Sequence, residues 1–309
     1  MTHDRICKSP HADDSDNTPI ASNSSKDLIP YGTPPLPLIE DDPDLVPLLR
    51  QASNEELAPL VKYITEKGGI SSDLQNTQRY IQNSPDHRMY ADDIAAEIQR
   101  FGANTIATRL RKGRGRTYRA ILIDAARKSG IRVRQKDKTE DIELGIIHAF
   151  LGLAWQKMSE RQRQELINSI RVEPSSGVKT AGATGSFQVL VQAGGFGPYE
   201  LAVIAANGVA KLLLGHGLSL AANAALTKSL SIFAGPLGMV FSALWLALLA
   251  AGPAYRVIMP CILQIALIRQ AALIRERAAK RRERLWYLIA LGALSFMLLV
   301  LGFFWIIEH

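Results

Sequence analysis

The last part of the chain is an uninterrupted apolar run. Residues 285–307 contain no charged side chain, and a helix of about 20 apolar residues spans the hydrocarbon core of a bilayer. A basic juxtamembrane segment, 271–284, precedes the run and includes Arg277, Lys280, Arg281, Arg282 and Arg284. Because loops rich in lysine and arginine stay on the cytoplasmic side, we predict a single C-terminal transmembrane helix, with the N-terminal bulk of the protein in the cytoplasm.

Composition and motif content narrow the class of protein. The chain has 309 residues, enough for about two domains, and its two cysteines, Cys7 and Cys261, lie far apart. We therefore expect a reducing compartment and no disulfide scaffold. We also expect no signal peptide, because no positive start leads into an apolar core. The histidines lack metal-ligand spacing, and P-loop, HExxH, CxxC and GxSxG motifs are absent. These absences predict no metal, no cofactor, no catalytic residue and no enzyme activity.

Composition and periodicity predict an all-α chain with several segments. Residues 1–41 are polar and predict a disordered tail. Residues 42–172 predict a helical N-terminal domain, and residues 173–198 a linker rich in glycine and serine. Residues 199–270 are apolar and rich in glycine and alanine, which predicts a closely packed helical C-terminal half before the transmembrane helix.

Local signals predict several boundaries. Ser53 to Glu56 and Ser159 to Gln162 match the capping-box pattern. Gly130 predicts the end of a helix. Ser84 and Pro85 predict the start of another helix, with proline in its first turn. A short hairpin at Phe187 to Val191 is a weaker expectation.

The segment that begins at Thr139 predicts a central core helix. Two acids follow Thr139 and favour the helix dipole. Apolar residues cover a wide face of this helix, with Ile142, Ile146, Phe150 and Leu153 along one side. His148 lies on the same helix, and we interpret it as a core histidine in preference to a catalytic base.

An uncharged stretch, 229–255, leaves three interpretations open. It is a buried helix of a globular domain, an interfacial or re-entrant hairpin, or a second membrane span. Its most apolar part, 237–251, is short for a span at about 1.5 Å per residue. Arg256 follows inside apolar sequence. Because an unpaired buried charge is costly, we predict that Arg256 is a structural buried charge with partners.

The densest positive charge lies between residues 100 and 138. Its centre interleaves glycines with arginines before a predicted helix, an arrangement that suits phosphate. The predicted anion or lipid-headgroup site comprises Arg109, Arg111, Lys112, Arg114, Arg116 and Arg119. A solvated basic face with structural arginines is the alternative. Anionic membrane lipids are the favoured partner, because the tail brings the chain to a bilayer. Nucleic acid is disfavoured, because aromatic residues are sparse here.

Several separate blocks resemble the YaaW family of uncharacterised bacterial proteins. They are residues 44–65, 101–131, 213–238 and 251–269. The resemblance implies a grouping with the ubiquinol-cytochrome c chaperone domain, an all-helical fold of assembly factors. It therefore implies that 42–172 is a helical binding module without enzymatic activity, and it assigns no catalytic residue.

These observations predict a protein of the bacterial inner membrane. We expect a non-enzymatic interaction or assembly (chaperone-like) factor at its cytoplasmic face, with anionic lipids, an unknown protein or a second copy as partners. One alternative is a membrane-perturbing stress or defence effector that acts through residues 199–251. A second alternative is nucleic-acid binding through the basic loop.

Overall fold

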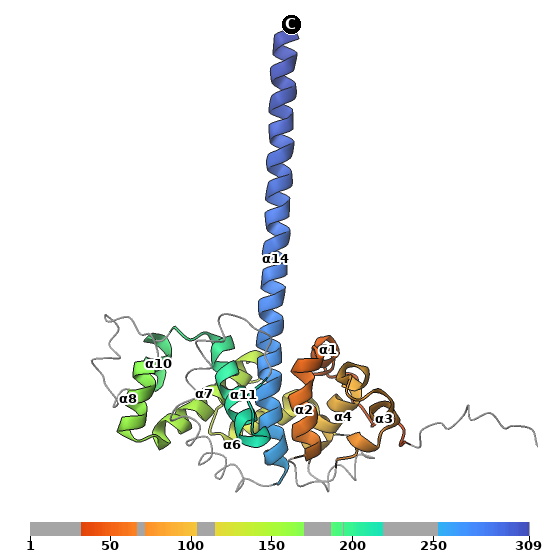
Figure 1. Ribbon diagram of the computed structural model, residues 1–309, viewed down its shortest axis with the longest axis vertical. Coiled ribbons are helices and arrows are strands. Elements are labelled where there is room, and N and C mark those ends of the chain that lie inside the picture. The colour runs from red at the N-terminus through yellow and green to blue at the C-terminus, as the bar shows by residue number, and fades with distance from the viewer. Residues whose placement is uncertain are drawn as a thin grey trace, which may run out of the picture. The chain divides into compact units, whose positions relative to one another are not determined.

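Helices make up the regular structure of the chain, as predicted (Figure 1). The computed structural model describes residues 32–66, 72–103, 115–169, 187–193, 195–218 and 253–308. The α-helices in these ranges are α1 (Val46–Gln51), α2 (Asn54–Glu66), α3 (Gln78–Asn83), α4 (Ala91–Phe101), α6 (Tyr118–Lys128), α7 (Thr139–Lys157), α8 (Glu160–Ser169), α10 (Phe187–Ala193), α11 (Pro198–Leu214) and α14 (Pro253–Glu308). Two short 3₁₀ helices are η1 (Leu74–Asn76) and η2 (His87–Tyr90).

Two apolar clusters form the core. The first joins α1, α2, α4 and α6 to the start of α7 and to one face of α14. The second joins the rest of α7 to α11 and to another face of α14. Of the predicted apolar half, α11 and the first turns of α14 are therefore buried among the helices of 42–172. Residues 219–252, which include most of the uncharged stretch, lie outside the described residues.

The predicted caps are confirmed. The Ser53 backbone N–H donates to Glu56 Oε2 at 2.8 Å, and the Glu56 N–H donates back to Ser53 Oγ at 3.3 Å. Ser159 and Gln162 repeat this pattern at 2.8 and 3.3 Å. Gly130 ends α6 with a φ of 76°, a left-handed conformation that glycine adopts without a steric penalty.

Four local predictions were wrong. The Ser84–Pro85 peptide is cis, and the next α-helix, α4, begins only at Ala91 after η2. Residues 187–193 form α10 instead of a hairpin, because Phe187 and Val191, four residues apart, both pack against the second apolar cluster. On α7, Leu153 is 44% exposed and His148 is exposed instead of lying in the core.

The polar N-terminal region is held against the helices from Thr33 onward. The Thr33 N–H donates to Asn76 O at 2.7 Å, and Leu36 and Ile39 donate their N–H groups to Asp93 and Gln99 of α4. This attachment corrects the predicted disordered tail for residues 33–41. Residues 1–31 lie outside the described residues.

Helix α14 runs from Pro253 to Glu308 as one element (Figure 1). The range 257–268 is buried in the core, whereas the described side chains from Ile274 onward are exposed. By length and composition alone, the described range 255–293 could cross a membrane. The most apolar window of this range is, however, largely buried within the protein. Most of the exposed large apolar side chains of the described residues therefore lie on α14 from Ile274 onward.

Candidate functional site

A buried ion pair joins α14 to the rest of the core. The Arg269 Nε–H donates to Glu143 Oε2 at 2.9 Å, where the Arg269 side chain is 13% exposed and Glu143 is fully buried. The other Glu143 oxygen accepts the hydroxyl of Tyr118 at 2.8 Å. A second Arg269 nitrogen donates to the carbonyl oxygen of Asp44 at 2.5 Å. One arginine of α14 is thus bonded to α7 and to the segment before α1, and through Glu143 it is linked to Tyr118 of α6.

The polar network continues from Tyr118 toward α4. The Tyr118 backbone N–H donates to Asp42 Oδ2 at 2.8 Å, and the same oxygen accepts Gln99 Nε2–H at 2.9 Å. Gln99 also exchanges two hydrogen bonds with the backbone of Ile39. These bonds join the segment before α1 to α4 and α6, and the Arg269–Glu143 pair connects α14 to the same network.

Burial governs the electrostatics of this network. Burial raises the pKa of Glu143, although the charge and the hydrogen bond of Arg269 oppose that change. Burial also raises the pKa of the Tyr118 hydroxyl well above its ordinary value. Proton exchange with solvent needs an accessible group, and neither side chain is accessible. The buried pair and the tyrosine are therefore suited to holding α14 in place. They are not suited to acid–base catalysis, because neither Glu143 nor Tyr118 is exposed to solvent.

Two further buried carboxylates predict an unusual pH dependence. Asp42 and Asp93 are each 1% exposed, and burial raises the pKa of both carboxyls above the ordinary 3.8. The folded protein then keeps protons that the unfolded chain has already lost, so this contribution to stability is lost as pH rises above about 4. We expect Asp93→Asn to gain stability relative to the native chain as pH increases. Urea unfolding at pH 4, 6 and 8 checks this, and a difference that is constant with pH would contradict it.

The predicted anion site divides between structural arginines and residues outside the described ranges. Arg109, Arg111, Lys112 and Arg114 lie outside the described residues. Arg116 is paired with Asp124 and donates to Ala120 O at 3.4 Å. Arg119 donates to Thr139 Oγ1 at 3.1 Å and to the carbonyl oxygens of Gln135 and Asp137 at 3.0 and 2.7 Å. Both arginines therefore hold the fold, and the anion site stays a prediction.

Arg256, the predicted structural buried charge, lies in the first turn of α14. Its side chain is partly buried, and among the described residues its Nε has no hydrogen-bond partner. The buried charge of α14 is Arg269, which the sequence interpretation missed. Another α14 cation, Arg275, bonds Glu56 of α2 at 2.8 Å near the surface.

The juxtamembrane cations are exposed in the structure. Lys280 pairs with Glu276 of the same helix. The other predicted members of the segment, Arg277, Arg281, Arg282 and Arg284, form no ion pair with a described residue. Of these, Arg277, Arg281 and Arg284 are spaced i, i+4 and i+7, so they share one face of α14.

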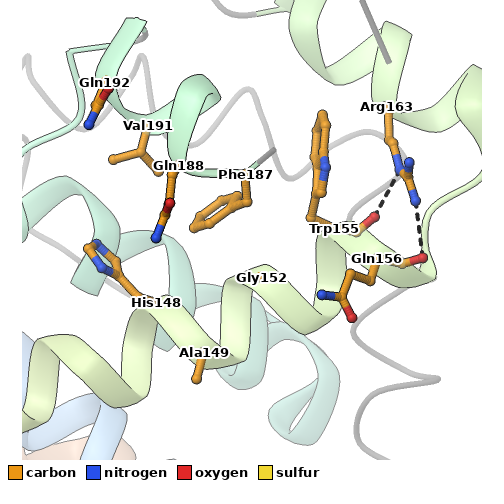
Figure 2. Close-up of a pocket in the computed structure, with 10 residues that line it drawn as sticks. All are labelled: His148, Ala149, Gly152, Trp155, Gln156, Arg163, Phe187, Gln188, Val191 and Gln192. Atoms are coloured by element: carbon orange, nitrogen blue, oxygen red, sulfur yellow. Dashed lines mark hydrogen bonds between the residues drawn. The ribbon is translucent and has the colours of Figure 1, made fainter. Parts of the chain in front are cut away.

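A pocket of about 790 Å³ lies between α7, α8 and α10 (Figure 2). Apolar and neutral polar side chains line most of it, namely His148, Ala149, Gly152, Trp155, Gln156, Phe187, Gln188, Val191 and Gln192. Among the described lining residues the one charged side chain is that of Arg163, which donates to the carbonyl oxygens of Trp155 and Gln156 at 3.0 and 3.1 Å. Partial burial lowers the pKa of His148. The described part of the chain places no carboxylate on the pocket wall, and it contains no cluster of His, Cys, Asp or Glu suited to a metal.

Known proteins of Helicobacter pylori and Escherichia coli are similar to this chain. A UPF0174 protein of Helicobacter pylori strain J99 is 35% identical over 196 residues, which cover 63% of this chain and 77% of that protein. A second UPF0174 protein of the same strain is 34% identical, over 65% of this chain and 98% of its own length. UPF0174 protein YaaW of Escherichia coli K12 is 30% identical over 238 residues, 74% of this chain and 94% of YaaW. No protein-family model and no solved structure matches the chain.

Proposed function

The chain belongs to the UPF0174 family, and we propose that it is a non-enzymatic interaction or assembly factor anchored in the bacterial inner membrane by its tail. In this proposal the helices of 32–268 lie in the cytoplasm. They present a binding surface, in the manner of a chaperone-like module, to a partner protein or to a second copy of the chain.

The observation that carries the proposal is the continuity of α14. Residues 257–268 near its start are buried, Arg269 bonds it to the core, and its described part beyond the basic segment exposes bulky apolar side chains. Leu285, Trp286, Tyr287, Leu288, Ile289 and Leu291 are each at least 52% exposed. Such a surface is unfavourable in water and favourable in a bilayer. Trp286 and Tyr287 follow the basic segment directly, at the level where aromatic side chains favour the membrane interface.

Charges inside the exposed half should release the protein from membranes. We expect the double variant Leu291→Arg/Met297→Arg to leave the membrane fraction, because each arginine near the centre of a span costs about 2.5–3.5 kcal/mol. Together these costs, about 5–7 kcal/mol, are comparable with the gain from the fourteen Leu, Ile, Phe and Val residues of 285–307, at about 0.3–0.6 kcal/mol each. The measurement is the share of full-length protein that stays with membranes after alkaline extraction.

A matched variant separates insertion from damage to the fold. Ile81 and Met89 are exposed on the helical body, at 44% and 60%. Ile81→Arg/Met89→Arg adds the same charge and should stay in the membrane fraction. Retention of the Leu291→Arg/Met297→Arg variant in that fraction would contradict the anchor.

The orientation follows from the basic segment. Anionic headgroups of the cytoplasmic leaflet attract Arg277, Arg281 and Arg284, so a reporter fused after His309 should lie on the outer side. An alkaline phosphatase fusion active at that position agrees with this orientation, whereas a fluorescent fusion folded in the cytoplasm opposes it. If expression of the chain instead collapses the membrane potential, that result supports the membrane-perturbing effector and contradicts the interaction or assembly factor.

A further inference from the structure

A short basic turn, residues 127–138, gathers exposed charge at the end of α6. Arg127, Lys128, Arg132, Arg134, Lys136 and Lys138 are all exposed. None forms an ion pair with a described residue, and Lys128 instead stacks on the ring of Tyr255 at 3.7 Å. Asp137 is the one acid within the turn, and one of its carboxylate oxygens accepts the Arg134 N–H at 2.8 Å. The basic turn is therefore a concentrated positive surface.

The fold holds this turn in a fixed conformation. The Ile131 N–H donates to Ala126 O at 2.9 Å across Gly130, which closes the end of α6. Ile131 and Val133 pack on the first apolar cluster, so the alternate residues Arg132 and Arg134 are left exposed. At its far end, Arg119 donates to the carbonyl oxygens of Gln135 and Asp137. A surface held before binding loses little conformational entropy when a partner binds.

The position of the turn along α14 separates it from the membrane. Lys128 contacts Tyr255, and Tyr255 precedes Leu285 by thirty residues of one helix, an axial distance of about 45 Å. The other end of the turn is clamped by Arg119, next to Tyr118, whose ring lies 6.0 Å from Arg269. Arg269 is still about 24 Å from Leu285 along the axis. The headgroup layer extends only about 5–8 Å beyond the hydrocarbon core.

We propose that the basic turn binds an acidic segment of a partner protein in the aqueous phase. This inference rests on the proposed function, because the axial distances matter only if the tail of α14 is the membrane anchor. Lipid contacts are then left to the juxtamembrane cations.

The geometry favours an acidic polypeptide over nucleic acid. Arg132 and Arg134 are two residues apart on a short non-helical segment, about 6–7 Å in extended chain, which matches alternate carboxylates of an extended peptide. Nucleic-acid sites add aromatic rings that stack on bases, but the Tyr255 ring, which the turn contacts, is covered by Lys128.

The test uses the full chain in phosphatidylcholine nanodiscs and a fluorescein-labelled deca-glutamate probe. Arg127→Gln/Arg132→Gln/Arg134→Gln should weaken probe binding about tenfold, because three exposed charge contacts contribute roughly 0.5 kcal/mol each. Arg277→Gln/Arg281→Gln/Arg284→Gln is the matched control and should leave probe affinity within about twofold. Binding to vesicles that contain phosphatidylglycerol should show the opposite pattern. Arg277→Gln/Arg281→Gln/Arg284→Gln should weaken vesicle binding, and Arg127→Gln/Arg132→Gln/Arg134→Gln should leave it unchanged.

Each contrary outcome has its own meaning. Weaker phosphatidylglycerol binding by the 127/132/134 variant, with unchanged probe binding, would make the turn a lipid site and overturn the proposal. Tighter binding of a single-stranded oligonucleotide that depends on the same three arginines would overturn the partner class. If the native chain stays soluble and does not enter nanodiscs, that result contradicts the proposed membrane anchor alone. Probe binding by that soluble chain still tests the turn.

Discussion

Arg269→Met is expected to lower the free energy of unfolding by about 3–5 kcal/mol. The substitution leaves Glu143 fully buried, with its charge opposed by no cation, and removes the bond to Asp44 O. A lone charge in the core is far costlier than a lost surface contact. Urea unfolding followed by circular dichroism of the full chain in detergent measures the change.

Two companion variants identify the cause. Arg269→Met/Glu143→Met removes both charges and should recover most of the loss, because the uncompensated carboxylate is gone. Arg88→Met breaks an ion pair with Asp86 in which the Arg88 side chain is 60% exposed, and we expect no measurable change. If the double variant is no more stable than Arg269→Met, the effect comes from packing of the arginine side chain and the ionic explanation fails.

The caps and the core faces could be predicted from sequence because their causes are local. Ser53 and Glu56 lie three residues apart, and Gly130 acts within one turn of α6. Ile142, Ile146 and Phe150 share the buried side of α7 by their spacing. Leu153 shows the limit of this reasoning, since α7 has apolar residues on most sides and the sequence does not say which side its neighbours leave open.

The ion pair could not be predicted, because its partners are 126 residues apart. Arg256 and Arg269 both stand in apolar sequence, and only the approach of α7 to α14 places Glu143 beside the second of them. The sequence does carry a signal for the continuity of α14. Residues 261–291 contain neither glycine nor proline, so the apolar half, the basic segment and the tail had no internal helix breaker to separate them.

Gly115→Ala is expected to destabilise the fold by about 3 kcal/mol, at the upper end of the usual cost of overpacking. Gly115 belongs to the glycine- and arginine-rich centre that sequence analysis predicted to cradle an anion. In the structure it lies against the end of α4, where an added Cβ would be 2.6 Å from the backbone nitrogen of Arg100 and even closer to the Gln99 carbonyl. The next residue, Arg116, donates its N–H to Gln99 O at 2.9 Å. Neither backbone has room to move without breaking that bond.

Gly145→Ala is the matched control, in the interior of α7. Its added Cβ would meet only Ile131 at an ordinary 3.7 Å, so the change should stabilise the protein by about 0.5–1 kcal/mol through helix propensity. Urea unfolding of the two variants should therefore shift in opposite directions. If Gly115 served mainly to cradle an anion, Gly115→Ala would leave the unfolding curve in place and weaken only phosphate binding. A fall in stability without bound anion instead makes the glycine a packing residue that lets the chain before α6 cross α4.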